Sequence, residues 1–224
     1  MKILVSSFSD KVFVNDIDNN IKLVNDFVDK GNMFIIASGK NISNIRKILG
    51  NRNLKCSYYI CNDGASIFDQ FMNVIYRIDI EKEYVKPIYN SLIDNSAIGD
   101  VKIDISTAFV DDYLRSTNKI VANYNDYDKA LKIANALNYR FNNLYAYLSG
   151  NYINITSKKA SKGSSLKYLL NYYNLNSNDV FTVSKDKNDL SLKDYESFVM
   201  DLSLKDFKYQ VNSFKEAIEK IEKF

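Results

Sequence analysis

Residues 2–13 read Lys-Ile-Leu-Val-Ser-Ser-Phe-Ser-Asp-Lys-Val-Phe, an apolar run that passes directly into a polar turn. Such a run at residues 3–6 predicts a strand buried on both faces, as in a parallel sheet covered by helices. In open α/β sheets, the carboxyl ends of the strands deliver side chains to the functional site. The segment therefore predicts an α/β protein whose site includes the residues that follow this strand.

Strand and helix patterns alternate beyond this first segment. A βαβαβ order predicts a doubly wound, Rossmann-like parallel sheet. Apolar runs predict strands at residues 33–37, 58–61, 180–183 and 198–200, and apolar residues at helical spacing predict helices at 19–30, 41–49, 163–173 and 213–223.

The pattern changes between residues 81 and 157. Helices are predicted at 82–94 and 126–138, and strands at 101–106, 119–123, 144–148 and 152–156, with Ser149-Gly150-Asn151 as a hairpin loop. The sequence therefore predicts a core domain of residues 1–80 plus 158–224, interrupted by an inserted α+β cap domain of residues 81–157.

Composition excludes several classes of function. The chain has 224 residues, 46% of them hydrophobic, and a net charge of +3 with no basic block, so nucleic acid is not an expected partner. No apolar stretch is long enough to cross a bilayer, and the two cysteines, Cys56 and Cys61, are expected to be reduced in the core. We expect a cytoplasmic protein. The absence of histidine excludes His-based triads and imidazole metal ligands.

Three further segments lie where a phosphate-transfer site would need them. They read Phe34-Ile35-Ile36-Ala37-Ser38-Gly39-Lys40, Ser161-Lys162-Gly163, and Val180 to Asp189, which ends in Lys187-Asn188-Asp189. Together with residues 7–11, in this order and spacing, they resemble the haloacid dehalogenase-like (HAD) superfamily. The large insertion resembles its Cof-type, sugar-phosphatase-like branch, and the resemblance covers nearly the whole chain.

The resemblance implies a magnesium-dependent phosphatase in which an Asp attacks phosphorus and a second Asp, two positions on, transfers the proton. Here those two catalytic positions hold Ser7 and Ser9, and Asp10 and Lys11 follow in place of Gly and Thr. In the fourth motif, Lys185 replaces a metal-binding Asp, whereas Asn188 and Asp189 match the family. Asp189 is thus a vestigial metal ligand.

The phosphate-binding residues of the family are retained. The resemblance assigns phosphate binding to Ser38, Gly39 and Lys162, and it matches the turn at Asn62 to a family Asn-Gly turn. With three carboxylates lost, the site would be about four charge units more positive than in active relatives, if all these groups converge. A lysine at the metal position repels a divalent cation, so we expect no bound magnesium and no other cofactor.

The expected function is therefore that of a degenerate HAD-like protein, catalytically inactive and binding phosphate or a small phosphorylated metabolite without metal. A serine with no histidine and no neighbouring base is a poor nucleophile. Two alternatives stay open at this point: an active phosphohydrolase on a sugar phosphate or similar metabolite, and a structural remnant that partners a related enzyme. The protein partner is not identified by the sequence.

Each candidate residue also has an ordinary interpretation. Ser7 and Ser9 could be turn hydroxyls, Lys162 a solvated residue, Ser38 a turn cap and Asp189 a helix cap. Asp16-Ile17-Asp18 is an alternative first motif in a shifted register, although these acids are better placed as helix caps. Charged residues on an expected cap loop, namely Asp111, Asp112 and Arg115, are candidates for ligand selection.

Overall fold

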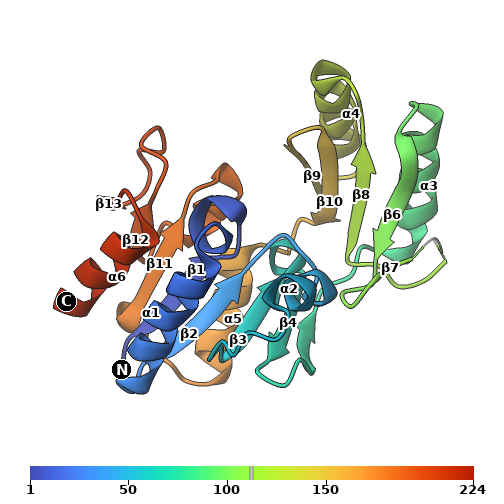
Figure 1. Ribbon diagram of the computed structural model, residues 1–224. Helices are drawn as coiled ribbons and strands as arrows, with labels where there is room; N and C mark the ends of the chain where they lie inside the picture. The colour runs from blue at the N-terminus through green and yellow to red at the C-terminus, as the bar shows by residue number, and fades with distance from the viewer. Residues whose placement is uncertain (111, 113) are drawn as a thin grey trace.

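The computed structural model describes residues 1–110, 112 and 114–224, so Asp111 lies outside the described residues. Two sheets form separate lobes, joined by the chain on either side of the smaller one (Figure 1). The larger sheet has eight strands in the order β13-β12-β11-β1-β2-β3-β4-β5, and the smaller has five in the order β7-β6-β8-β10-β9. The expected α/β class is confirmed.

The strands of the larger sheet are parallel from β13 to β3, and β4 and β5 are added antiparallel. Their bounds are β1 Ile3–Ser7, β2 Met33–Ala37, β3 Tyr58–Cys61, β4 Ser66–Asp69, β5 Val74–Arg77, β11 Val180–Ser184, β12 Glu196–Val199 and β13 Tyr209–Gln210.

Helices cover both faces of this sheet. On one face lie α1 (Ile17–Asp29), α2 (Ile42–Leu49) and α6 (Phe214–Lys223), whose apolar sides share a core with Leu4. On the other face lies α5 (Lys162–Tyr172), packed against Ile3 and Val5. Neighbouring residues of β1 thus enter opposite cores, which is why the strand is apolar without alternation.

β1 is the strand at which the order of the sheet reverses. It pairs with β2 on one side and β11 on the other, and the chain runs outward from it in both directions. Parallel α/β sheets bind ligands outside the carboxyl ends of the strands at such a point. The fold therefore directs Ser7 and the residues after it towards a binding crevice.

The smaller sheet is antiparallel and has two different faces. Its apolar side chains, among them Ile120, Ile153 and Ile155, pack under α3 and α4. Because side chains alternate along a strand, the opposite face carries Lys119, Tyr147 and other polar groups. The elements are α3 Lys82–Asp94, β6 Ile98–Asp104, β7 Phe109–Val110, β8 Lys119–Asn123, α4 Tyr127–Arg140, β9 Leu144–Ser149 and β10 Tyr152–Ser157.

We refer to this smaller lobe as the cap and to the larger one as the core. The expected boundaries at residues 80/81 and 157/158 remain a prediction, although every strand of the smaller sheet falls within that insertion. Cys56 and Cys61 are buried and free, as expected. Among the described residues, no helix has the length and apolar character needed to cross a membrane.

The turn that follows β1 was not predicted from the sequence. Residues Asp10–Val14 form a single π-helical turn directly after β1, with the amides of Phe13 and Val14 both donating to the carbonyl of Ser9. The Phe13 ring holds this turn in place, lying 5.6 Å from the ring of Phe8 and 5.3 Å from that of Phe214. The loop after β1 is therefore fixed by aromatic packing.

Candidate functional site

The ends of β1 and β2 bring Ser7 and Ser38 to adjacent positions. Ser7 pairs with Ala37 in the parallel register, and the amide of Phe8 donates to the Ala37 carbonyl at 3.0 Å. Ser38 is buried, and its Oγ accepts from the amide of Lys40 at 3.1 Å, as expected of a turn cap. Capping this turn is compatible with the expected binding of phosphate by Ser38, because a hydroxyl has two acceptor lone pairs and one proton to donate.

Lys162 is fully buried at the first turn of α5, so its interpretation as a solvated residue is wrong. Its Nζ lies 2.5 Å from Oδ1 of Asp189, and both side chains are almost inaccessible to solvent. Burial by itself would lower the pKa of Lys162, but Asp189 and Asp63 outweigh that effect and keep the pKa above its ordinary value. Lys162 is therefore positively charged at neutral pH.

Asp189 serves the protein as a structural anchor. Its Oδ2 accepts long hydrogen bonds of 3.5 Å from the amides of Lys185 and Asp186. Asp186 begins the short helix Lys187–Leu192, and the two acids form a reciprocal cap there. This arrangement resembles the expected role as a helix cap, except that Asp189 occupies the third helical position.

Two close backbone approaches position Lys162. A Cβ on Gly64, whose φ is +93°, would lie 2.1 Å from the carbonyl oxygen of Ser161, and a Cβ on Gly163 would lie 2.0 Å from that of Ser191. The first contact seats α5 on the turn after β3, and Ser165 Oγ donates to the Gly64 carbonyl at 2.5 Å. The second seats α5 on the helix that carries Asp189.

We predict that Gly64→Ala destabilises the protein by about 1–3 kcal/mol, because the added methyl group forces α5 away from the turn and the positive φ is strained. Urea denaturation of the variant would measure this. Gly150→Ala is the matched control, because Gly150 also has a positive φ but its Cβ would meet nothing within 4 Å. Equal losses for the two variants would show that backbone strain alone, and not the packing of α5, explains the effect.

Asp63 connects the core to the cap. Its Oδ2 lies 2.6 Å from Nζ of Lys119 on β8 and accepts from the hydroxyl of Tyr147 on β9 at 2.5 Å. Burial would raise the pKa of Asp63, but the ammonium groups of Lys119 and Lys162 outweigh it, so the pKa lies below the ordinary value. Lys119 also donates to the carbonyl of Gly39 at 2.8 Å.

A second set of buried contacts joins the lobes beside this one. Nδ2 of Asn62 donates to Oδ1 of Asn118, and Nδ2 of Asn41 donates to Oδ2 of Asp104, both at 2.9 Å. Asn62 therefore lies at the joint between core and cap, where its amide orients the two lobes. Burial raises the pKa of Asp104 in spite of these hydrogen bonds.

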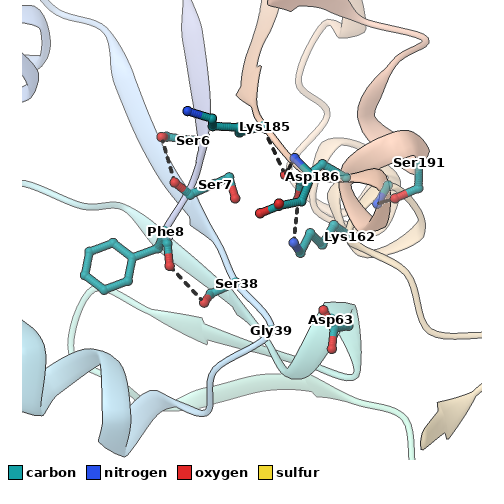
Figure 2. A network of polar contacts seen from close by, with 12 residues as sticks. Ser6, Ser7, Phe8, Ser38, Gly39, Asp63, Lys162, Lys185, Asp186 and Ser191 are labelled. Carbon is teal, nitrogen blue, oxygen red and sulfur yellow. Dashed lines mark hydrogen bonds and ion pairs between the residues drawn. The ribbon is translucent and has the colours of Figure 1, made fainter. Parts of the chain in front are cut away.

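A cleft of about 590 Å³ lies between the strand ends of the core and the polar face of the cap sheet. Figure 2 shows its core side, with Ser7, Ser38 and Lys162 around one space and Asp63 beside Gly39. The cleft is lined by Ser7, Phe8, Ser9, Ser38, Gly39, Lys40, Asn44, Lys119, Val121, Tyr147, Ser149, Tyr152, Asn154, Lys162, Asp186 and Asn188.

Two of the expected lysines do not line this cleft. Lys11 is mostly exposed and lies 3.4 Å from Oδ1 of Asp186. The ammonium group of Lys185 points away from Lys162 (Figure 2). The condition for the expected excess of positive charge, convergence of all these groups, is therefore not met.

Ser9 and Asn188 carry unused hydrogen-bonding atoms at the cleft. Ser9 Oγ and Asn188 Oδ1 are buried and have no hydrogen-bond partner among the described residues. Buried polar atoms in folded proteins are nearly always paired with protein, water or ligand. Because both residues line the cleft, the Ser9 hydroxyl can donate a hydrogen bond to a bound molecule or accept one from it, and Asn188 Oδ1 can accept one.

The alternative first motif lies elsewhere. Asp16 stands at the N-terminus of α1 and accepts from the side chain of Asn19, and Asp18 is exposed and paired with Arg52 at 2.6 Å. Neither acid lines the cleft. On the cap, Arg115 pairs with Asp112 at 3.4 Å, and neither of these residues lines it either.

The cap residues of the cleft were missed by sequence reasoning. Lys119, Val121, Tyr147, Tyr152 and Asn154 were assigned only to strands, with no function. The signal that could have found Tyr152 and Asn154 is the alternation within 152–156, where polar and apolar residues take turns. Alternation separates the two faces of a sheet, but it does not say which face meets the core.

Comparisons with known proteins identify the family of the chain. The family model described as haloacid dehalogenase-like hydrolase matches residues 15–108 and 100–195, and the match begins beyond Ser7–Lys11. The chain belongs to this family, as expected from the sequence. A candidate phosphatase of Buchnera aphidicola is 22% identical over 77% of this chain and 74% of its own.

Solved structures share the fold over the full length. A candidate HAD/Cof-like hydrolase from Plasmodium vivax superposes with a TM-score of 0.84 at 19% identity, covering 100% of this chain and 94% of its own. A sugar phosphatase of HAD subclass IIB gives a TM-score of 0.80 at 13% identity, covering 100% and 99%. The fold is therefore that of the Cof-type branch of the superfamily.

Proposed function

We propose that this protein binds phosphate or a small phosphorylated metabolite in the cleft, without a metal ion, and does not hydrolyse it. The observation that carries this proposal is the state of Asp189. It is the one acid kept at a family metal position, and it is buried and bonded to Lys162. The two positions of the family's catalytic acids, Ser7 and Ser9, carry hydroxyl groups.

The residues present do not fit magnesium. Magnesium requires near-octahedral coordination by hard oxygen ligands, usually including carboxylates. Among the described residues, no group of three or more His, Cys, Asp or Glu side chains is placed to hold a metal. Asp189 has its oxygens committed to Lys162 and to backbone amides. These residues therefore provide no coordination shell for magnesium.

The same cleft contains the groups that an anion needs. Lys162 offers further N–H donors beyond its bond to Asp189, and Ser7, Ser9 and Ser38 offer hydroxyls. Lys40 adds an ammonium group at the rim. Charge-assisted hydrogen bonds to phosphate oxygens are stronger than neutral ones, so binding without metal is chemically sound.

Hydrolysis is the alternative function, and one observation favours it. Asp186 is a carboxylate in the wall of the cleft, so an acid is available within a family of phosphohydrolases. A carboxylate in this position could accept a proton from a water molecule in the cleft. Proton transfer alone contributes about 10²–10⁴ in rate, so an active site of this kind would be slow but measurable.

We predict that inorganic phosphate binds in the presence of a chelator and that added magnesium leaves its affinity unchanged. At about 100 times its dissociation constant, phosphate should raise the free energy of unfolding by about 2.7 kcal/mol. Chemical denaturation with and without phosphate measures this shift. Lys40→Met should weaken binding, whereas Lys47→Met, an exposed lysine on α2, is the matched control and should not.

An assay with p-nitrophenyl phosphate and magnesium separates the two functions. Release of inorganic phosphate by the pure protein, lost in Asp186→Asn, would establish the hydrolase and contradict the proposal. Absence of phosphate binding under all conditions would contradict it as well.

A further inference from the structure

Asp63 is a buried carboxylate placed between the two buried lysines of the cleft. Its side chain is only 10% exposed, and Lys119, only 5% exposed, contacts it directly. Lys162 acts on it electrostatically from the core side. Its second oxygen, Oδ1, has no hydrogen-bond partner among the described residues. Only one oxygen of the carboxylate, Oδ2, is therefore hydrogen-bonded, and the positive charges of the two lysines stabilise the group as a whole.

The ammonium and carboxylate groups around the cleft are equal in number. Its wall carries three ammonium groups, Lys40, Lys119 and Lys162, and one carboxylate, Asp186. Directly behind the wall, Asp63 is paired with Lys119 and Asp189 with Lys162. A bound anion would therefore interact electrostatically with three carboxylates as well as with the three ammonium groups.

Lys119 is nevertheless able to contact a ligand. Two of its three N–H groups donate to Asp63 and to the Gly39 carbonyl, which leaves the third for a ligand in the cleft that Lys119 lines. An anion bound by the third donor would lie close to the carboxylate behind it. That repulsion grows with the charge on the anion.

We propose that Asp63 tunes the charge preference of the cleft, because its carboxylate lowers the affinity for doubly charged anions by more than the affinity for singly charged ones, such as phosphodiesters. This inference rests on the proposed function, because it concerns the anion bound in the same cleft. The carboxylate contacts Lys119 and lies within electrostatic reach of Lys162, so its charge acts on any anion that these lysines hold. The repulsion from Asp63 is about twice as large for a doubly charged anion as for a singly charged one, so Asp63 offsets part of the stronger attraction that the lysines exert on the doubly charged anion.

The test compares two probes in the wild type and in Asp63→Asn. Asparagine keeps the size of the side chain and an acceptor oxygen for Lys119 but removes the charge. The probes are sulfate, which is doubly charged, and dimethyl phosphate, which is singly charged. Binding is followed by NMR titration at fixed ionic strength and in the presence of a chelator, because salt screens these interactions.

The electrostatic gain scales with the charge of the probe. We expect Asp63→Asn to bind sulfate about tenfold more tightly and dimethyl phosphate about threefold more tightly than the wild type. The gain in the logarithm of the affinity is then twice as large for sulfate. Differences in shape between the probes cancel, because each probe is compared only with itself.

Two controls separate charge from structure. Asp26→Asn removes the same charge from an exposed position on α1 and should change neither affinity. If Asp63→Asn fails to fold, Asp63→Ser removes the charge with a smaller polar group, and circular dichroism verifies the fold of each variant. A looser contact between cap and core would alter both affinities by the same factor.

Each result decides between the two ideas. A doubled logarithmic gain for sulfate supports the inference. Equal gains, or losses, for both probes overturn it and leave metal-free anion binding intact. If neither the wild type nor the variants bind either probe, the proposed function itself fails, and the role of Asp63 fails with it.

Discussion

Replacement of Lys162 by methionine should lower the free energy of unfolding by about 3–5 kcal/mol. The substitution keeps most of the side-chain volume but leaves the carboxylate of Asp189 buried without its counter-ion. An isolated buried charge loses its hydration and gains nothing in return. Urea denaturation at pH 7 measures the loss, which is a large part of the total stability of an ordinary domain.

The matched control is an exposed ion pair of the same chemistry. Lys193 and Asp206 lie 3.5 Å apart with 42% and 55% of their side chains exposed. Lys193→Met should cost less than about 1 kcal/mol, because water solvates the remaining carboxylate. Lys162→Met combined with Asp189→Leu should recover most of the stability. A loss below 1 kcal/mol for Lys162→Met alone would show that water reaches Asp189.

The structure of the core could be predicted because its signals are local. The first strand was expected at residues 3–6 and is found at Ile3–Ser7, since five consecutive buried residues leave little ambiguity. Parallel strands end at one edge of a sheet, so Ser7 and Ser38 could be expected to converge, and the family resemblance placed Lys162 beside them. The cleft lining contains all three.

The remainder of the site depends on contacts between distant segments. Nothing near Asp63 in the sequence indicates that Lys119, 56 residues later, is its partner. The prediction of a more positive site was wrong for the same reason. Lys11 pairs with Asp186 and does not line the cleft, and the cap contributes Lys119, which pairs with Asp63. The π-helical turn at Asp10–Val14 was missed because Phe13 is fixed by rings from β2 and α6.

A triple substitution, Ser7→Asp with Ser9→Asp and Lys185→Asp, should create magnesium binding and phosphatase activity. These positions lie at the carboxyl ends of β1 and β11, which pair in parallel with Ser6 opposite Val183. Three carboxylates there supply the hard oxygen ligands that the wild type lacks. We expect release of phosphate from p-nitrophenyl phosphate at least about 100-fold faster than in the wild type.

Magnesium binding can be followed separately from turnover. Magnesium should raise the stability of the triple variant and leave that of the wild type unchanged, because only a protein that binds the ion is stabilised by it. The double variant Ser7→Asp with Ser9→Asp keeps Lys185, which supplies no carboxylate ligand and whose positive charge opposes a cation at these strand ends. It should therefore bind magnesium more weakly than the triple variant.

If all three proteins responded equally to magnesium, the ion would be binding outside these strand ends. If the triple variant bound magnesium but released no phosphate, then the missing acids would not be the only obstacle. The contacts from Asp63 to Lys119 and Tyr147, which hold the cap on the core, would then be the next feature to alter.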